Sequence, residues 1–392
     1  MAILAVNAGS SSLKFSIHPL QGNTVQDPVL TGAIQGLEPA GQPTICWIWQ
    51  GQRHERPLAS TGTPFQRALQ DLQALLKQLA LPPLRAVAHR VVHGGQHYAG
   101  SVRVTPHVMR ALQALVSLAP LHQPHNLAGI RAFMAAFPNV PQVACFDTAF
   151  HATLPAEESH FALPQALTAQ GIRRYGFHGL SYQFVIGTLQ ARSARAQGRT
   201  LMAHLGNGAS LCATLQGRSQ ATTMGFSALD GLMMGTRCGA LDPGVLLYLL
   251  EQGWDHDRIQ ALLYRQSGLL GVSGIAADMR TLRASTEPAA QFAIELFTRR
   301  VVRATGELSA CIGGLDVLAF SGGIGENDAL LRADVARRLA YLGVRVDATL
   351  NAQPMQDDTA WAIHAPDSAV EVWVVPTDEG RVAAAEAAAL VL

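Results

Sequence analysis

Short apolar stretches that end in small polar segments recur along this chain and limit the folds it can adopt. The first stretch, residues 3–6, runs directly into the polar segment 7–14. Similar segments occupy residues 204–210, 321–327 and 376–379, each beside an apolar stretch. Apolar runs of this length bounded by glycine and polar residues are typical of strands. The pattern predicts β-sheets whose strand ends carry polar loops.

Helical periodicity lies between these strands, as in residues 64–79, where apolar side chains recur on one face. The first half is predicted as an antiparallel meander of strands followed by alternating helices and strands: strands 3–6, 13–17, 29–34 and 44–49, helix 64–79, strand 86–92, helices 106–118 and 126–137, and strand 142–146. The second half repeats this order: strands 201–205 and 210–215, helices 243–250, 257–264 and 288–311, strands 316–320 and 372–375, and helix 379–392. The repetition predicts an α/β protein with two similar lobes around a central cleft.

The length of 392 residues suits two domains. We expect an N-terminal lobe of residues 1–148 with the C-terminal helix, 377–392, and a nucleotide-binding lobe of residues 149–376. The near balance of 29 Lys and Arg against 28 Asp and Glu favours neither nucleic acid nor an anionic membrane as a partner. Five scattered cysteines without a C-x-x-C pair, and an N-terminus without a signal-peptide pattern, predict a soluble cytoplasmic protein.

The segment 7–14 has the side chains of a phosphate-binding loop. Gly9 permits a tight turn, Ser10 and Ser12 offer hydroxyl groups, and Lys14 offers a cation. For a single such loop, a plain hairpin with serines bonded to their own backbone is the better explanation. The presence of four such segments favours a functional site.

Two glycine-rich segments predict further contacts to a nucleotide. Gly206-Asn207-Gly208 resembles the tip of a hairpin, where glycines let backbone amides approach a polyphosphate. Residues 322–325 are predicted as a loop between a strand and a helix that starts near Asn327. An ordinary Asn-Gly turn and close strand-to-helix packing are the alternatives. The P-loop pattern and the dinucleotide-binding glycine pattern are both absent.

Longer motifs give the chain a resemblance to a known family. They are 7–14, His89-Arg90-Val91-Val92-His93-Gly94-Gly95, Phe146-Asp147-Thr148-Ala149-Phe150-His151, Tyr175-Gly176-Phe177-His178-Gly179, 204–210, Met234-Gly235-Thr236-Arg237, 322–327 and 376–379. Together they resemble the acetokinase family, within the sugar kinase, Hsp70 and actin superfamily, over nearly the whole chain. The resemblance implies two actin/ribonuclease-H-like lobes, a homodimer, and reversible transfer of the ATP γ-phosphoryl group to acetate, giving acetyl phosphate and ADP.

The same resemblance implies roles for individual residues. Asp147, His178 and Arg237 would form the catalytic group, and Arg90 would contact the carboxylate substrate beside a small apolar pocket at Val92 and Leu121. Asn7 and Glu379 would hold Mg²⁺, with Mn²⁺ as an alternative. The implied ATP/ADP contacts are Ser10, Ser12, Lys14, His204, Leu205, Gly206, Asn207, Gly208, Asp278, Met279, Arg280, Gly323, Ile324, Gly325, Glu326 and Asn327. Cys238 and Ala240 depart from the family pattern beside Arg237.

The chemistry narrows these roles. A carboxylate is ionised at neutral pH, so its attack on the γ-phosphorus needs no general base, and Asp147 is better cast as a positioning group. Arg90 and Arg237 would neutralise two anions brought together, and His178 would donate to an equatorial oxygen. These residues predict direct in-line transfer. The rivals are a propionate or other short-chain acyl kinase, which a smaller residue at position 92 would favour, and an actin-like ATPase without kinase activity.

Overall fold

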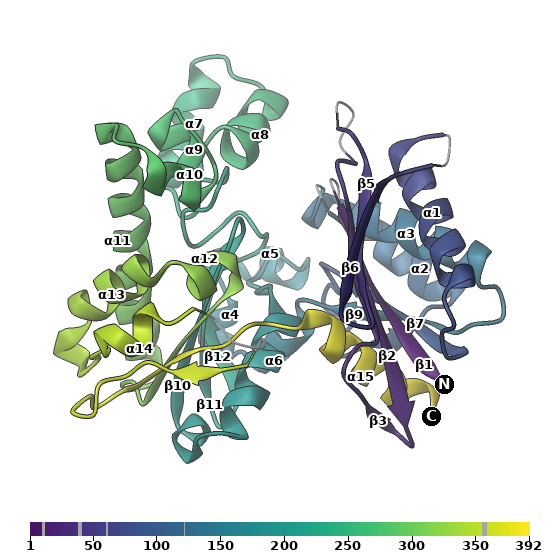
Figure 1. Cartoon of the computed structure of the whole chain (residues 1–392). Helices are drawn as coiled ribbons and strands as arrows, with labels where there is room; N and C mark the ends of the chain where they lie inside the picture. Colours follow the sequence, from purple (N-terminus) through teal and green to yellow (C-terminus); the bar gives the residue numbers. More distant parts are fainter. Residues whose placement is uncertain (10–11, 38–40, 60–61, 121, 355–358) are drawn as a thin grey trace. The chain divides into compact units, whose positions relative to one another are not determined.

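The computed structural model describes residues 1–9, 12–37, 41–59, 62–120, 122–354 and 359–392. The chain divides into two compact units (Figure 1). Unit 1 comprises Met1–Phe150 and Asp378–Leu392, and unit 2 comprises His151–Thr377. Each unit contains one mixed sheet with helices packed against it.

Unit 1 is built on a nine-stranded sheet with the path β6-β5-β4-β2-β1-β7-β9-β8, and β3 pairs with β2. Its strands are β1 (Ala2–Ala8), β2 (Ser12–Gln21), β3 (Thr24–Val25), β4 (Leu30–Gln35), β5 (Thr44–Trp49), β6 (Gln52–Pro57), β7 (Leu84–Val91), β8 (Val102–Arg103) and β9 (Gln142–Phe146). Neighbours from β1 to β6 pair antiparallel, which confirms the predicted meander. Strands β7 and β9 continue the sheet parallel to β1.

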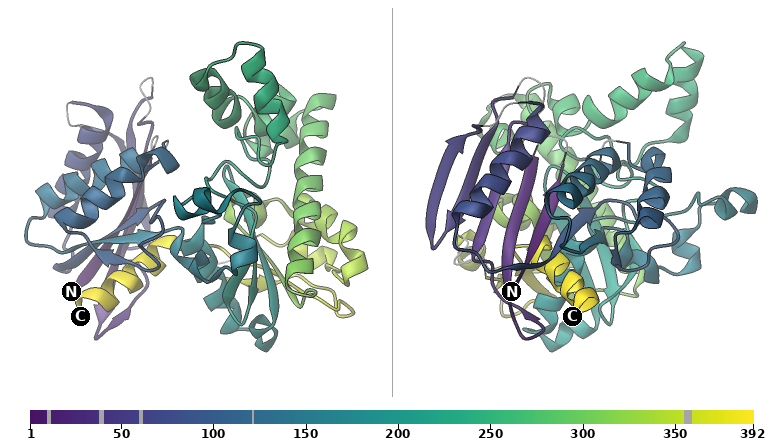
Figure 2. Two further views of the ribbon diagram at one scale, coloured as in Figure 1. Left: turned by 180° about the vertical axis from the view of Figure 1, so that it is seen from behind. Right: turned by 90° about the vertical axis from the view of Figure 1, so that its right-hand side faces the viewer.

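The helices of unit 1 are α1 (Pro64–Gln78), α2 (Pro106–Ala114), α3 (Gln123–Ala136) and α15 (Glu379–Val391). Helix α1 starts with a capping box between Thr63 and Gln66 and buries Leu69, Leu72 and Leu75. The C-terminal helix α15 lies against β1 and β7 (Figure 2). Its buried residues are mostly alanines, so the helix backbone can lie close to the sheet. This packing brings Glu379, the first residue of α15, into unit 1.

Unit 2 is built on a six-stranded sheet with the order β12-β11-β10-β13-β15-β14. Its strands are β10 (Arg199–Leu205), β11 (Ala209–Leu215), β12 (Arg218–Thr222), β13 (Val317–Ser321), β14 (Trp361–Ala362) and β15 (Glu371–Val374). Strands β10 to β12 are antiparallel, and β13 and β15 run parallel to β10. The core β12-β11-β10-β13-β15 therefore repeats the order and directions of β4-β2-β1-β7-β9 in unit 1. This confirms the prediction of two similar α/β lobes.

The helices of unit 2 are α4 (Ala156–Ser159), α5 (Gln165–Ala169), α6 (Gly179–Gln190), α7 (Pro243–Glu251), α8 (His256–Arg265), α9 (Gly268–Ser273), α10 (Met279–Ala284), α11 (Pro288–Cys311), α12 (Gly322–Asn327), α13 (Ala329–Arg338) and α14 (Ala348–Ala352). The long helix α11 packs against β10, β11 and β12, and α6 packs against β10. Across the described residues, no helix is both long enough and apolar enough to span a membrane.

The prediction for residues 322–325 was wrong. They form the helix α12, which begins at Gly322 directly after β13, and not a loop before a helix near Asn327. Glycines are poor helix formers, so other groups must stabilise this turn. The Glu326 carboxylate accepts from the Gly322 amide, 2.8 Å away, and the buried Arg332 donates to the carbonyls of Gly325 and Glu326. These side-chain bonds satisfy both ends of the short helix.

Candidate active site

In unit 1 the predicted residues Asn7, Arg90, Asp147 and Glu379 gather around one guanidinium. Arg90 donates from Nε to Asp147 Oδ1 at 3.0 Å and from Nη2 to Asp147 Oδ2 at 2.5 Å. Its Nη1 donates to Asn7 Oδ1 at 3.2 Å, and its Nε lies 3.2 Å from Glu379 Oε2. The cluster draws on four elements. Asn7 lies in β1, Arg90 in β7 and Glu379 in α15, and Asp147 directly follows β9.

The charges of this cluster depend on one another. Burial in the protein raises the pKa of Asp147 to about 6, the Arg90 guanidinium opposes this rise, and the Glu379 carboxylate adds to it. The two carboxylates raise the pKa of Arg90 far above its ordinary value, although burial opposes them. Arg90 therefore stays charged, and its guanidinium is fixed in orientation by a bidentate partner.

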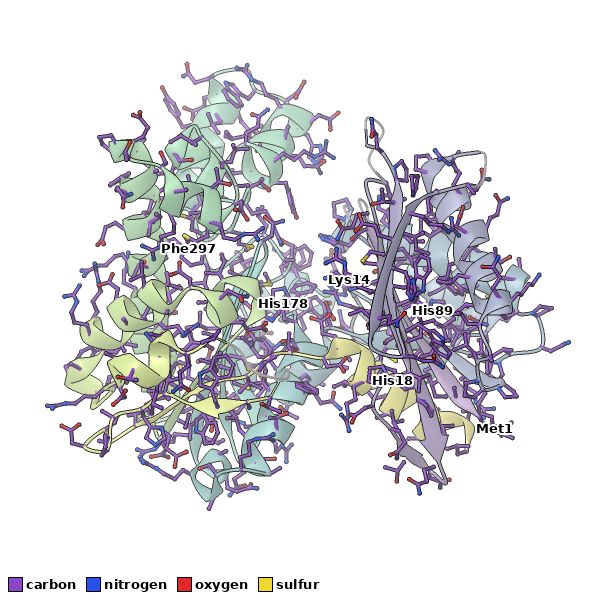
Figure 3. The ribbon with its side chains drawn as sticks, viewed as in Figure 1. Met1, Lys14, His18, His89, His178 and Phe297 are labelled. Carbon is purple, nitrogen blue, oxygen red and sulfur yellow. The ribbon has the colours of Figure 1, made fainter. Side chains whose placement is uncertain are left out.

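The described residues of the segment 7–14 belong to β1 and β2, which pair antiparallel with Asn7 directly opposite Lys14. The Gly9 amide closes its turn on the Ser12 carbonyl at 2.8 Å. Lys14 (Figure 3) is exposed and lines a cavity of about 340 Å³ on the β2-β4-β5-β6 part of the sheet, with Cys46 and Arg53. Val92 follows β7 and is buried. The predicted site residues Ser10 and Leu121 lie outside the described residues.

In unit 2, His178 precedes α6 with a left-handed backbone, φ 59° and ψ 24°. Its ring stacks on that of His204 with centroids 4.2 Å apart. The Nδ1 of His178 lies 2.8 Å from Ser210 Oγ, and the Nδ1 of His204 lies 2.8 Å from Ser181 Oγ. A left-handed conformation is strained for a residue with a Cβ, so surrounding contacts must hold His178 in place.

Gly206, Asn207 and Gly208 join β10 to β11, which confirms the predicted hairpin tip. A Cβ at Gly208 would lie 2.7 Å from Nη2 of Arg237 and 3.4 Å from Nε2 of His178. Both side chains therefore converge on this glycine. The loop that carries Arg237 is tied to the tip because the Gly235 amide donates to the Asn207 carbonyl at 3.0 Å.

The unusual residues beside Arg237 contact the protein through their backbones. The Cys238 amide donates to the Leu263 carbonyl at 3.1 Å, and the Ala240 amide donates to the Gly231 carbonyl at 2.8 Å. Gly239 between them has φ 71°, and a Cβ there would lie 2.3 Å from the Leu232 carbonyl oxygen. The turn therefore requires the glycine, and Cys238 adds a side-chain bond from its Sγ to the Gly239 carbonyl at 3.1 Å.

The remaining predicted nucleotide contacts fall into two segments of unit 2. Residues 323–327 lie in α12, where Glu326 Oε1 also accepts from the Thr377 amide at 3.3 Å. Asp278 caps α10 by accepting from the Thr281 amide at 3.0 Å, and this bond lowers the pKa of Asp278. Met279 is buried, and the side chain of Arg280 is exposed. The carboxylates of Glu326 and Asp278 thus both accept hydrogen bonds from backbone amides within unit 2.

The unit 1 cluster suits a magnesium ion by its chemistry. Asn7, Asp147 and Glu379 provide the carboxylate and amide oxygens that Mg²⁺ prefers. Among the described residues, no three His, Cys, Asp or Glu side chains gather closely enough to hold a metal by themselves. Mg²⁺ commonly uses one or two carboxylates together with waters and substrate phosphates, so few protein ligands are expected. The residues therefore fit the predicted metal.

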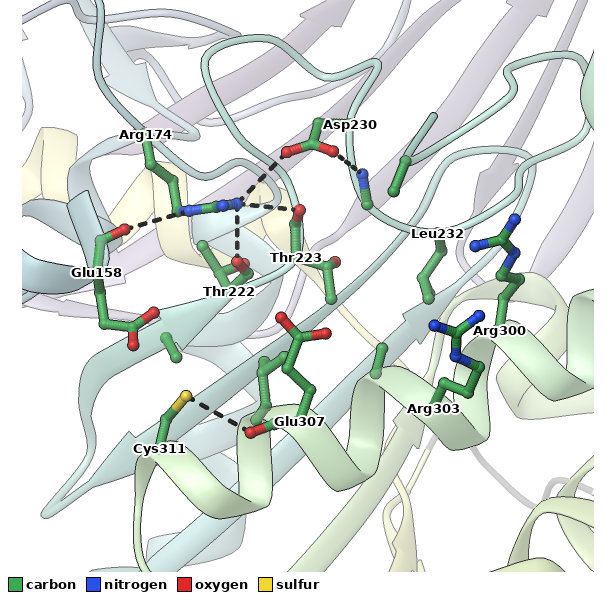
Figure 4. A pocket seen from close by; sticks show the side chains of 15 residues that line it. Glu158, Arg174, Thr222, Thr223, Asp230, Leu232, Arg300, Arg303, Glu307 and Cys311 are labelled. Atoms are coloured by element: carbon green, nitrogen blue, oxygen red, sulfur yellow. Dashed lines mark hydrogen bonds and ion pairs between the residues drawn. The ribbon is translucent and has the colours of Figure 1, made fainter. Parts of the chain in front are cut away.

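A second cavity, of about 300 Å³, lies in unit 2 and is lined by none of the predicted site residues (Figure 4). Arg174 occupies one side, where it bonds to the carbonyls of Thr222 and Thr223 and lies 3.6 Å from Asp230 Oδ2. The other charged residues that line this cavity are Glu158, Arg300, Arg303 and Glu307. Because acidic and basic side chains balance, this cavity has no net preference for an anion.

Comparisons with known proteins identify the family to which this chain belongs. The model of the Acetokinase family matches residues 2–385. The chain belongs to the acetokinase family. It is 50% identical over 383 residues to an acetate kinase from Rhodopseudomonas palustris, covering 96% of this chain and 95% of that relative. It is 40% identical over 390 residues to an acetate kinase from Rickettsia akari, covering 98% of each chain.

Solved structures agree with this assignment. A propionate kinase from Francisella tularensis matches with a TM-score of 0.86 and 34% identity, covering 98% of both chains. An acetate kinase from Porphyromonas gingivalis matches with a TM-score of 0.86 and 33% identity, again covering 98% of both chains. The predicted family and fold class are therefore confirmed.

The sequence analysis assigned no role to the side chains that support the site. Tyr182, Ser181 and Thr377 bond directly or through a serine to the stacked histidines, and Arg332 holds α12. Tyr182 and Ser181 lie on α6, a helix that was not predicted because its apolar residues are not confined to one face. Its glycine start after a histidine gave no capping signal either.

Proposed function

We propose that this member of the acetokinase family catalyses reversible transfer of the γ-phosphoryl group of ATP to acetate, giving acetyl phosphate and ADP. The observation that carries the proposal is the convergence of Arg237 and His178 on Gly208, at the tip of the β10–β11 hairpin. A glycine tip lets backbone amides approach a polyphosphate, and the two side chains add a fixed cation and a ring N–H donor beside it.

In this proposal the unit 1 cluster around Arg90 binds the carboxylate substrate, which accepts the phosphoryl group. The Arg90 guanidinium has five N–H groups. Among the described residues, two of them donate to Asp147 and one donates to Asn7. The guanidinium then has further N–H groups for a substrate carboxylate, while Asp147 fixes its orientation. Asp147 acts as a positioning residue because an acetate ion at neutral pH has no proton to give up. Val92, which is buried beside β7, contributes to an apolar site for the methyl group.

In this proposal most of the residues that bind the nucleotide belong to unit 2. Gly206 to Gly208 and the residues 323–327 would contact ATP, with Asp278 to Arg280 near the adenosine and Ser12 and Lys14 of unit 1 toward the phosphates. Arg237 would offset the charge that develops on the transferred group, and His178 Nε2 would donate to one of its oxygens. No side chain is assigned as a phosphoryl acceptor, so we propose direct in-line transfer without a phosphoenzyme.

Asn7 and Glu379 would hold Mg²⁺, with Mn²⁺ as a substitute. When bound, the ion would draw negative charge from the phosphate oxygens. Glu379 is suited to this role because it is the first residue of α15 and its carboxylate is partly exposed, with 23% of the side chain accessible.

We also propose a cytoplasmic homodimer. All five cysteines are free, which suits a reducing compartment. Helix α7 supports an interface in unit 2, since Leu247, Tyr248 and Leu250 are each more than half exposed. Apolar side chains that gather on one short helix are typical of a surface that another protein covers.

Initial rates of ADP formation test the proposal. The purified protein would receive ATP and MgCl₂ with formate, acetate, propionate or butyrate, and a sample without carboxylate serves as the control. We expect ADP formation to depend on the carboxylate and to be most efficient with acetate. Propionate should act at roughly 10-fold to 200-fold lower efficiency, because one methylene changes discrimination by about 1–3 kcal/mol. ADP release at the same rate without any carboxylate would instead support an actin-like ATPase.

A further inference from the structure

A chain of buried hydroxyl groups leads to His178 in unit 2. Tyr182 is fully buried on α6, one turn after His178, and its hydroxyl lies 2.5 Å from Ser210 Oγ. Ser210 is also fully buried, and its Oγ lies 2.8 Å from Nδ1 of His178.

The partners fix the direction of this chain. A phenol O–H is a stronger hydrogen-bond donor than an aliphatic O–H, so the phenolic proton of Tyr182 points to Ser210 Oγ. Since Ser210 accepts there, its own proton points to Nδ1 of His178. The reverse direction would require the weaker aliphatic O–H of Ser210 to donate to the phenolic oxygen of Tyr182.

We propose that Tyr182 and Ser210 are positioning residues that keep His178 as the neutral tautomer with its proton on Nε2. In that tautomer Nδ1 accepts from Ser210, and Nε2–H is the donor that faces Gly208. The role rests on the proposed function, in which Nε2–H donates to an oxygen of the transferred phosphoryl group. The wrong tautomer would present a lone pair to that oxygen and would repel it.

Two neighbouring features favour the neutral ring. The ring centroid of the stacked His204 lies 4.2 Å from that of His178, and Arg237 Nη2 lies close to the same Gly208 position, 2.7 Å from a Cβ built there. A positive charge on His178 would be repelled by the Arg237 guanidinium and by any charge on His204. The hydroxyl chain therefore selects between two neutral forms.

His204 provides an internal comparison. Its Nδ1 lies 2.8 Å from Ser181 Oγ, which accepts from Thr377 Oγ1 at 2.9 Å. The two stacked rings thus bond to different serines. Ser181→Ala removes the hydroxyl beside His204 and leaves the hydroxyl chain of His178 intact, so it serves as a control for the effect on one ring.

The experiment uses the full chain labelled with ¹⁵N-histidine, without substrates, at pH 8. Two-bond ¹H–¹⁵N spectra distinguish a protonated from an unprotonated ring nitrogen, and His178→Gln assigns the His178 signals. We expect wild-type His178 to show an unprotonated Nδ1 and a protonated Nε2. In Tyr182→Phe and Ser210→Ala the two signals should move toward each other as the tautomers mix. In Ser181→Ala and in Tyr175→Phe, which loses another buried tyrosine bond, they should stay in place.

Steady-state kinetics then separate this role from a structural one. Tyr182→Phe, which keeps the shape of the ring, should lower kcat roughly 10-fold to 100-fold and change KM for ATP less than about threefold. A protonated Nδ1 in the wild type, or an unchanged tautomer in both variants, would overturn the proposal. If the tautomer shifts as expected while the wild type phosphorylates no carboxylate, the proposed function fails and the assignment of the tautomer stands.

Discussion

The Arg90 guanidinium binds both carboxylate oxygens of Asp147, which is only 1% exposed as a side chain, whereas Arg90 keeps 19% of its side-chain area exposed. The buried partner fixes the guanidinium, and the exposed part remains accessible to a ligand. Such a pair costs desolvation energy, so its presence fits a functional role better than a stabilising one.

This pair predicts a strong energetic coupling. Arg90→Ala should destabilise the protein by about 3–5 kcal/mol, because it leaves the buried Asp147 carboxylate without its cation. The double variant Arg90→Ala/Asp147→Ala should lose less than the sum of the single variants. Urea unfolding of the four proteins measures the coupling.

An exposed pair gives the matched control for this cycle. Arg345 and Asp367 form an ion pair with side chains 62% and 64% exposed, and their coupling should be below about 1 kcal/mol. Equal coupling energies for the two pairs would show that the Arg90–Asp147 pair is not energetically special.

Arg237→Ala should lower kcat roughly 10³-fold, because the variant lacks the cation proposed to offset the charge on the transferred phosphoryl group. The melting temperature should change little. The substitution removes the bond from Arg237 Nη1 to the Ala228 carbonyl, but the backbone bond from the Met234 amide to the Arg237 carbonyl can still form. Arg337→Ala, which removes an exposed arginine of α13, is the control. Near-normal turnover of the Arg237 variant would remove Arg237 from the catalytic group.

Gly208→Ala tests whether the hairpin tip must stay free of side chains. The new methyl group would lie 2.7 Å from Arg237 Nη2, so the guanidinium would have to move. We expect kcat/KM for ATP to fall about 100-fold, as for a misplacement of roughly 1 Å. Gly187→Ala on α6 is the control, because its Cβ meets no atom within 4 Å and alanine favours the helix by about 1 kcal/mol. Similar kinetics for both variants would show that the tip has no special role.

Much of the fold followed from local patterns. The predicted bounds of β5, β9 and α11 agree with the structure to the residue. Both the spacing of their apolar residues and the turn-forming residues at their ends mark these elements. Helix α6 was missed because it is apolar on several faces, and α12 was missed because side-chain bonds from Arg332, six and seven residues further along, offset its glycines.

For the candidate site, the sequence pointed to the residues that the structure gathers within each unit, such as Arg90 with Asp147. It could not point to Tyr182 or Ser210 as partners of His178. Their bonds join residues 28 and 32 positions apart, and only the tertiary structure brings them together. Tyr182 lies in an apolar segment and carries no local signal of such a role. Ser210 belongs to the polar segment 204–210, but nothing local points to its bond with His178.

Two buried histidines predict a loss of stability in acid. Burial lowers the pKa of both His89 and His151 from 6.5 to about 4. Between pH 6.5 and about 4 the unfolded chain binds a proton at each residue that the folded protein does not. The free energy of unfolding should therefore fall as the pH falls, by about 1.4 kcal/mol per pH unit for each histidine, and should not depend on them above pH 6.5.

Urea unfolding of wild type, His89→Gln and His151→Gln at intervals from pH 4.5 to 7.5 measures this dependence. Each variant should lose about half of the wild-type slope that these two residues cause below pH 6.5. Parallel curves for the wild type and both variants would contradict the assignment of neutral buried histidines.

The central claim is that the phosphoryl group of ATP ends on a carboxylate. Its most direct test incubates the purified protein with ATP, MgCl₂ and acetate in the presence of hydroxylamine, and compares the acyl hydroxamate formed with the ADP released. We predict one hydroxamate for each ADP and neither product above background without acetate. ADP with inorganic phosphate and no hydroxamate would contradict the account.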